Sequence, residues 1–398
     1  MSPLVLLILA SLLCQTPHPG SSAAAVSIER VGDSGARFVT GAHQMQPGSE
    51  LLVRPDGLVR VGSFHVPPEA GGPANRGFAW GGTALAFNPA NNSLFIVGHD
   101  WDQLTAEISI PAMGGTARLL QGLADPVEGR RVSVDEDKVG GQLVYGGRLV
   151  VTKFGFFDAS KSQVASHIVR PLDLATKGQA RGPFSVGSFG PGYYSGYMTQ
   201  VPVAWQSKLG GPVLTGNCCL SILSRTSYGP AAFVIDPANI GVKPDAVPLV
   251  YYTHDHQTLG TYGEKGSHPV FNGSTRIRGV VFPDGTSSVL FFGATGIGNY
   301  CYGFAPDCGA PGTDKGEHAY PYRAYVWAYN ARDLAAVKAG KVRPWAVTPY
   351  ATWELPLGEI HFDGLGGATY DPATRRIFVS QKRGGVGDLP LIHVFELK

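Results

Sequence analysis

Three ionisable side chains in one short segment near the C-terminus could carry out proton-transfer chemistry. The segment reads GEIHFDG, residues 358–364, and Glu359, His361 and Asp363 alternate within it. In an extended chain alternating side chains lie on one face. A carboxylate pair, or a carboxylate with an imidazole, could then act as general acid and base. The alternative is that Asp363 caps the glycine-rich turn that follows and His361 packs beneath a loop.

A second cluster, GHDWDQ at residues 98–103, places His99 and Asp100 beside Trp101. Carbohydrate sites often combine an aromatic ring, which packs on the apolar face of a sugar, with a carboxylate that accepts hydrogen bonds from hydroxyls. The alternative is an aspartate-rich turn with a packed tryptophan. The predicted catalytic residues are therefore the three carboxylates with the two histidines assisting them: Asp363, Glu359, Asp100, His99 and His361.

Further residues are candidates for substrate binding. The segment GPGYYSGY, residues 190–197, supplies tyrosines that could form a wall of a site or pack within their loop. Arg278 alternates with Arg276 and could hold a carboxylate bidentately, as an acidic sugar such as a uronate would require. Pairing with an aspartate of the protein is equally compatible. The predicted substrate-binding residues are Trp101, Tyr193, Tyr194, Arg278 and Lys153.

Two histidines in THDHQ, residues 253–257, would share one side of an extended segment. His254 and His256 could then bind a transition metal, with His268 or Glu264 as a third ligand. The sequence contains no HExxH motif and no paired CxxC motif. We therefore predict no metal and no other cofactor, and interpret these histidines as hydrogen-bonded or surface side chains.

A repeat that links the two ends of the chain indicates how these residues are positioned. Residues 77–111 and 363–397 share a small-residue start, an apolar strand, an Asx-Pro turn and two further strands. The turns are Asn88-Pro89 and Asp371-Pro372. Two such copies far apart indicate a repeat architecture. The 54 glycines and 30 prolines, with 43% hydrophobic residues, fit many short strands joined by turns.

We predict an all-β fold, a five-bladed β-propeller with four strands in each blade. The first strands are predicted at residues 83–87, 142–145, 201–205, 278–282 and 368–370, and a short helix at residues 333–339. The last blade runs out of chain after three strands. A strand within residues 58–66 is expected to complete it, because closure removes an open sheet edge. The alternative is six blades, with residues 26–66 forming most of a separate one.

In a propeller, the loops after second strands and the loops between blades open on one face, around the mouth of the central channel. Under the predicted blade assignment, the candidate residues lie in those loops or beside them. The opposite face receives plain turns such as Asp284-Gly285. We therefore expect the functional site at the channel mouth.

The N-terminus indicates export. Residues 4–13 form an apolar run too short to span a bilayer, and Ala23-Ala24-Ala25 follows as a small-residue cleavage site. Residues 1–25 are predicted to be a signal peptide and residues 26–398 a single domain with no membrane span, secreted or periplasmic. Cys301 and Cys308 form the natural local disulfide. Cys218 and Cys219 could pair with each other, one of them could reach across to another loop, or both could remain buried thiols, and the sequence leaves the pairing open.

Composition limits the partners. Only 16% of the residues are charged, the formal net charge is +2 and no basic stretch occurs, so nucleic acid is not expected as a partner. Low charge with 10% aromatic residues suits a neutral, hydroxyl-rich ligand.

The repeat, over residues 58–397, resembles that of secreted β-propeller proteins. Five long blades are similar to those of the five-bladed glycosidases of the arabinanase and β-xylosidase type. That resemblance implies three carboxylates at the channel mouth: a base or nucleophile, an acid, and an aspartate that orients them. We expect an exported carbohydrate-active enzyme that cleaves glycosidic bonds, as a hydrolase or as a lyase with Arg278 on a uronate. The alternative is a non-catalytic propeller that binds a glycan or a protein partner.

Overall fold

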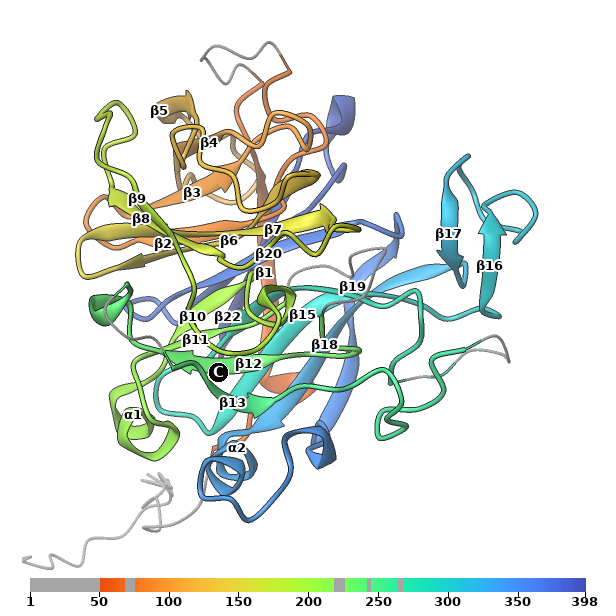
Figure 1. Ribbon diagram of the computed structural model, residues 1–398. Helices are drawn as coiled ribbons and strands as arrows, with labels where there is room; N and C mark the ends of the chain where they lie inside the picture. Colours follow the sequence, from red (N-terminus) through yellow and green to blue (C-terminus); the bar gives the residue numbers. More distant parts are fainter. Residues whose placement is uncertain (1–50, 69–75, 218–225, 242–244, 264–267, 269) are drawn as a thin grey trace, which may run out of the picture. The chain divides into compact units, whose positions relative to one another are not determined.

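The computed structural model describes residues 51–68, 76–217, 226–241, 245–263, 268 and 270–398 (Figure 1). Residues 50–398 form one compact unit. The predicted signal peptide, and Cys218 and Cys219, lie outside the described residues. Among the residues described, no helix is both long and apolar enough to cross a membrane.

Five antiparallel sheets of four strands form a ring, which is a five-bladed β-propeller. Blade one contains β2 (Leu85–Asn88), β3 (Ser93–Val97), β4 (Thr105–Ser109) and β5 (Leu119–Ala124). Blade two contains β6 (Glu136–Tyr145), β7 (Arg148–Phe157), β8 (His167–Pro171) and β9 (Arg181–Phe184). Blade three contains β10 (Met198–Gln200), β11 (Val213–Thr215), β12 (Ala232–Ile235) and β13 (Val247–Val250).

Blade four contains β14 (Arg276–Val281), β15 (Ser288–Gly296), β18 (Tyr322–Asn330) and β19 (Ala351–Ile360). Blade five contains β20 (Leu365–Asp371), β21 (Arg376–Gln381), β22 (Leu391–Leu397) and β1 (Leu58–His65). A separate hairpin of β16 (Cys301–Phe304) and β17 (Lys315–His318) lies between β15 and β18 in the chain and stands off from the blades (Figure 1). Two helices complete the fold, α1 (Val203–Leu209) and α2 (Ala331–Lys338).

The ring closes as the sequence predicts. Strand β1 pairs antiparallel with β22, with Phe64 opposite Ile392, so the N-terminal strand supplies the outermost strand of the C-terminal blade. Around the axis, the first strand of each blade contacts the first strand of the next, and β20 contacts β2. The prediction of five blades is confirmed, and the six-bladed alternative is excluded.

Glycines allow the innermost strands to approach one another at the axis. A Cβ atom at Gly141 would lie 2.2 Å from the carbonyl oxygen of Gly196, and one at Gly366 would lie 1.9 Å from that of Gly82. Any side chain at Gly141 or Gly366 would therefore push neighbouring blades apart. Away from the axis, each sheet is sandwiched between two others, so central strands such as β15 are buried at every position.

One predicted strand is a helix. Residues 201–205 were expected to form the first strand of blade three, but β10 takes that position and α1 begins at residue 203. Trp205 and Leu209 lie four residues apart and are both buried, which is the period of a helix face. Gly210, with φ of 98°, ends the helix and donates its N–H to the Gln206 carbonyl over 2.8 Å.

Two segments beside the strands are attached to blade four. Pro344–Ala346 is a 3-10 turn that precedes the fourth strand of the blade, β19, which begins at residue 351. The Val53 N–H donates to the Ser288 hydroxyl over 2.8 Å, which attaches the segment before β1 to blade four.

A buried histidine lies between blades two and three. His167 is fully buried, with Nδ1 2.8 Å from the Ser166 hydroxyl and Nε2 3.2 Å from the Thr215 hydroxyl. Thr215 donates its only hydroxyl proton to the Tyr194 carbonyl over 2.7 Å, so it accepts from His167. Nε2 therefore carries a proton. Burial lowers the pKa of His167 to about 3, so the ring is neutral at neutral pH.

This histidine predicts a pH-dependent stability. Unfolded His167 binds a proton near pH 6.5, whereas the folded side chain stays neutral down to about pH 3. The free energy of unfolding should therefore fall by about 1.4 kcal/mol per pH unit from this residue as the pH drops between those values. Urea denaturation of wild type and His167→Gln at several pH values measures the difference. The free energy of unfolding of His167→Gln should depend less on pH than that of wild type, and an equal dependence would contradict the assignment. Ile168→Val, a change at the buried neighbour, should lower the free energy of unfolding by the same amount at each pH.

Ring closure by β1 can be tested with two changes on one strand. Phe64 is fully buried and packs edge-on against Phe378 of blade five, with ring centroids 6.4 Å apart. Phe64→Ala should lower the free energy of unfolding by about 3–5 kcal/mol, since it leaves a cavity between blades five and one. Val61→Ala, at an exposed position of β1, should change it by less than about 0.5 kcal/mol. Equal effects in urea denaturation would mean that β1 does not close the ring.

Candidate functional site

A cavity of about 370 Å³ lies where the sequence predicts the channel mouth. Asp100 follows the second strand of blade one and Asp363 precedes the first strand of blade five, and both line it. The lining includes four acidic and four basic side chains: Asp100, Asp314, Glu317, Asp363, Lys138, Arg276, Arg278 and Lys315. Aromatic side chains complete most of the wall: Phe154, Phe156, Tyr262, Tyr302 and Phe362.

Asp363 lies between two cations. One carboxylate oxygen accepts a hydrogen bond from Arg278 Nη2 and the other accepts from Lys382 Nζ. Burial alone would raise the pKa of Asp363, but Arg278 and Lys382 hold it well below its usual range. The carboxylate is therefore ionised at neutral pH, where it can accept hydrogen bonds but holds no proton to donate.

Asp100 belongs to the same charge network. Its carboxylate is 2.7 Å from Lys138 Nζ, which is also 3.3 Å from Glu136. Burial raises the pKa of Asp100, but the charges of Lys382 and Lys138 outweigh that effect and lower it. Lys382 thus stabilises both lining aspartates. We define the mouth network as the five side chains that alternate in charge: Arg278, Asp363, Lys382, Asp100 and Lys138.

The β16–β17 hairpin supplies another wall of the cavity. We call it the arm, residues 301–318. A disulfide between Cys301 and Cys308 closes its first half, which confirms the local pairing that the spacing favours. Glu317 of β17 forms an ion pair of 3.1 Å with Arg276 of β14. The arm is therefore attached to the blade beside the cavity as well as through its two chain connections.

Tyr262 is one of the residues that line the cavity. Burial is the main cause that raises its pKa, and the nearby carboxylate of Glu317 adds to it. The phenol therefore keeps its proton at neutral pH. Its ring lies edge-on to Tyr228, with centroids 5.0 Å apart, so packing limits its rotation.

Two predicted catalytic residues beside Asp363 do not line the cavity. Glu359 lies on β19, the outermost strand of blade four, where it accepts a hydrogen bond from the Tyr320 hydroxyl. The chain then turns, with the Gly364 N–H donating to the His361 carbonyl over 2.8 Å. The expectation of one extended segment is wrong because of this turn. His361 packs against Phe362, with ring centroids 4.5 Å apart, and burial, then Arg383, lowers its pKa.

His99 and Trp101 flank Asp100 but are not part of the cavity wall. Trp101 is 76% exposed, and the Arg76 guanidinium carbon lies 5.1 Å from its ring centroid. The Trp101 N–H donates to His99 Nδ1 over 3.1 Å. These two residues therefore lie beside the site, next to a carboxylate that lines it.

The other predicted binding residues have packing or ion-pair roles. Tyr194 is fully buried, and its hydroxyl lies 2.7 Å from the Phe189 carbonyl oxygen and 2.9 Å from that of Gly187, so its one proton is donated within this loop. Tyr193 packs edge-on against Phe189. Lys153 is buried and forms an ion pair of 2.8 Å with Asp137. Of the five predicted binding residues, only Arg278 lines the cavity.

The histidines of residues 253–257 are engaged in other contacts. His256 Nδ1 accepts from the Thr258 N–H over 3.0 Å, and its Nε2 is 3.1 Å from the Tyr228 carbonyl. His254 packs edge-on against the Tyr228 ring. Glu264 lies outside the described residues. Over the part of the chain that is described, no three His, Cys, Asp or Glu side chains are grouped to hold a metal.

Sequence reasoning did not select several residues that line or support the cavity: Lys138, Lys382, Tyr262, Tyr302, Asp314 and Lys315. Part of the signal was present. Residues 297–321 form a long insertion after a second strand, and the propeller topology assigns such loops to the mouth. The two cysteines in that insertion also indicate a structured element. The cationic role of Lys382 depends on its distance from Asp363, which no local pattern shows.

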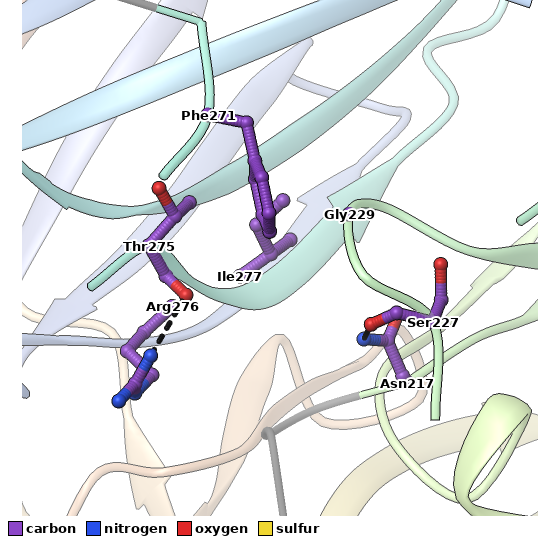
Figure 2. Close-up of a pocket in the computed structure, with 7 residues that line it drawn as sticks. All are labelled: Asn217, Ser227, Gly229, Phe271, Thr275, Arg276 and Ile277. Carbon is purple, nitrogen blue, oxygen red and sulfur yellow. Dashed lines mark hydrogen bonds between the residues drawn. The ribbon is translucent and has the colours of Figure 1, made fainter. Parts of the chain in front are cut away.

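Two other hollows differ from the mouth cavity. Figure 2 shows the residues that line a hollow of about 10 Å³, with Arg276 beside Thr275. They are Asn217, Ser227, Gly229, Phe271, Thr275, Arg276 and Ile277. That volume is at the limit for one water molecule. A groove of about 670 Å³ lies beside β5 and residues 173–178. Its Arg170 donates to four backbone carbonyls and its Glu128 accepts from backbone N–H groups, so both shape the groove wall.

No protein-family model and no curated protein match the sequence. Among solved structures, the chain is similar to the Kuenenia stuttgartiensis hydrazine synthase, with 12% sequence identity and a TM-score of 0.29. The match covers 75% of this chain and 64% of that chain, so this chain spans less than two thirds of its length. Neither the fold described above nor the function proposed below depends on this likeness.

The mouth network predicts an asymmetry between two acidic residues. Asp363→Asn leaves Arg278 and Lys382, which are 11% and 5% exposed, without their carboxylate. The free energy of unfolding should fall by about 3 kcal/mol, because removing one partner of a buried ion pair is costly. Glu359→Gln, at an exposed ion pair, should lower it by less than about 1 kcal/mol. Urea denaturation at neutral pH compares the two, and similar values would show that the network does not stabilise the mouth.

Proposed function

We propose that the mouth cavity binds a carbohydrate. The observation that carries this proposal is that Asp100 and Asp363 line one cavity as ionised acceptors, beside several aromatic rings. Sugar hydroxyls donate well to carboxylates, and charge-assisted hydrogen bonds are about twice as strong as neutral ones. The apolar faces of sugar rings pack on aromatic side chains. The cavity therefore has both contacts that a sugar needs.

Charge balance favours a neutral sugar over an acidic one. The lining holds equal numbers of acidic and basic side chains. Arg278, the predicted partner for a uronate, already donates to Asp363. A uronate would have to compete with that aspartate for the guanidinium. A neutral, hydroxyl-rich ligand requires no such exchange.

Cleavage of glycosidic bonds at the same site is the second candidate. It is favoured by the placement of two carboxylates in one cavity, and by the similarity in blade number to the five-bladed glycosidases. Glycoside hydrolysis also requires a protonated acid. Asp100 and Asp363 are unprotonated at neutral pH, so the proton would come from another lining group. Tyr262 retains its proton and is the candidate donor. With either activity, the N-terminal segment leads us to propose that the protein is exported, secreted or periplasmic.

A panel of neutral cello-, xylo-, manno- and arabino-oligosaccharides tests this proposal. Isothermal titration should detect binding of at least one series to the wild type. Asp100→Asn should weaken that binding about 10- to 100-fold, because a hydrogen bond to a charged acceptor is worth about 1.5–3 kcal/mol. Glu359→Gln, a matched change outside the cavity, should bind like wild type.

Product analysis of the same mixtures separates the two candidates. Shorter saccharides that form with wild type, and fail to form with Tyr262→Phe, would establish cleavage with the tyrosine as donor. Intact saccharides after long incubation, with binding that depends on Asp100, would establish binding alone. If no series binds to the wild type, or if Asp100→Asn binds every series unchanged, the carbohydrate site is not at the mouth.

A further inference from the structure

We propose that the binding surface continues from the mouth cavity onto two exposed aromatic side chains at its rim, Tyr302 of the arm and Trp101 of blade one. The ligand would then be an oligosaccharide rather than a single sugar. This inference rests on the carbohydrate binding proposed above and adds the length of the ligand and the residues that read it.

The size of the cavity is the first support for a longer ligand. At about 370 Å³ it lies near the lower end of the range of ligand pockets, which is about 300–1,000 Å³. Its walls come from blades one, two, four and five and from the arm. A glycan of several units that placed one part between Asp100 and Asp363 would have to continue over the rim.

The arm presents aromatic rings in a regular pattern. Tyr302 and Phe304 alternate on β16, so their side chains share one face of the strand. They are 59% and 52% exposed, although rings of this size are usually buried at least in part. Tyr302 also lines the cavity, which makes the arm a continuation of the cavity wall.

The arm is held in place before any ligand binds. The Cys301–Cys308 disulfide covalently closes the segment that contains Tyr302. The 3.1 Å ion pair between Glu317 and Arg276 attaches the other strand to blade four. An aromatic platform that is already ordered loses little conformational entropy when a sugar packs on it. The arm is therefore suited to binding and not only to covering the cavity.

Trp101 provides a platform on the blade-one side. It is 76% exposed, whereas the next most exposed of the described tryptophans, Trp80, is 42% exposed. Arg76 lies 5.1 Å from the Trp101 ring centroid and forms an ion pair of 3.1 Å with Asp102. This cation orients the indole while most of its surface stays accessible. Asp100, the residue immediately before Trp101, lines the cavity and so connects this platform to the cavity wall.

The experiment compares saccharides of one to six units from the series that binds to the wild type. Isothermal titration should show affinity that rises with length up to at least four units. Tyr302→Ala and Trp101→Ala should each weaken binding of the hexasaccharide about three- to tenfold. Trp101→Ala, at a ring outside the cavity wall, should weaken binding of the monosaccharide less than twofold. Phe157→Ala is the control. Phe157 is exposed on β7, but it points to the opposite face of the strand from its neighbour Phe156, which lines the cavity.

The outcomes distinguish this inference from the proposed function. In one outcome, affinity does not rise with length and Tyr302→Ala and Trp101→Ala bind like wild type, while Asp100→Asn binds weakly. That outcome overturns the extended surface and keeps the mouth site. Binding that is insensitive to Asp100→Asn, or absent in every series, overturns both. Thermal unfolding of each variant close to that of wild type shows that weaker binding reflects the lost ring.

Discussion

Pairing of β1 with β22 is the constraint on which the arrangement of the mouth depends. It joins residues more than 300 positions apart and completes the blade that carries Asp363 and Lys382. Closure then places blade five next to blade one, where β20 contacts β2. Asp100 is thereby brought within the electrostatic reach of Lys382 and Asp363. The acidic residues of the mouth thus meet where the last blade contacts the first.

Electrostatics then determine what the mouth can do. Four members of the mouth network come from three different blades or blade ends: Arg278, Asp363, Lys382 and Asp100. Each carboxylate is partly withdrawn from water, yet the cations keep its pKa low. Such groups act as fixed acceptors, since their charge does not change over the neutral range. A site of this kind binds hydroxyls more readily than it transfers protons, and any proton transfer needs a group outside the network.

The fold could be predicted further than the site. The Asx-Pro turns at residues 88–89 and 371–372 mark the same corner of two blades, and in each the Asx side chain accepts from the N–H two residues on. The strand missing from the last blade pointed to β1. The prediction failed at α1, because a short apolar run between a proline and a glycine does not distinguish a strand from a helix without its neighbours.

The site could be predicted only in outline. The topology indicated the face, and Asp100, Asp363 and Arg278 were all selected. The alternative that Arg278 pairs with an aspartate of the protein is confirmed, but the partner was not identified, because Asp363 is 85 positions away and was assigned a separate role. Glu359 shows the converse error. Alternation in sequence implied a shared face with Asp363, but the turn at residues 361–364 breaks the extended segment, and Glu359 does not line the cavity.

Hydroxyl-radical footprinting, read out by mass spectrometry, tests most directly the proposal that the channel mouth binds a carbohydrate. With a saturating hexasaccharide from the binding series, oxidation of Tyr302, Trp101 and Phe156 should fall, while that of Phe157 and of Leu120 in the groove beside β5 should not change. Protection confined to Leu120, or equal oxidation of all five side chains with and without the saccharide, would contradict carbohydrate binding at the channel mouth.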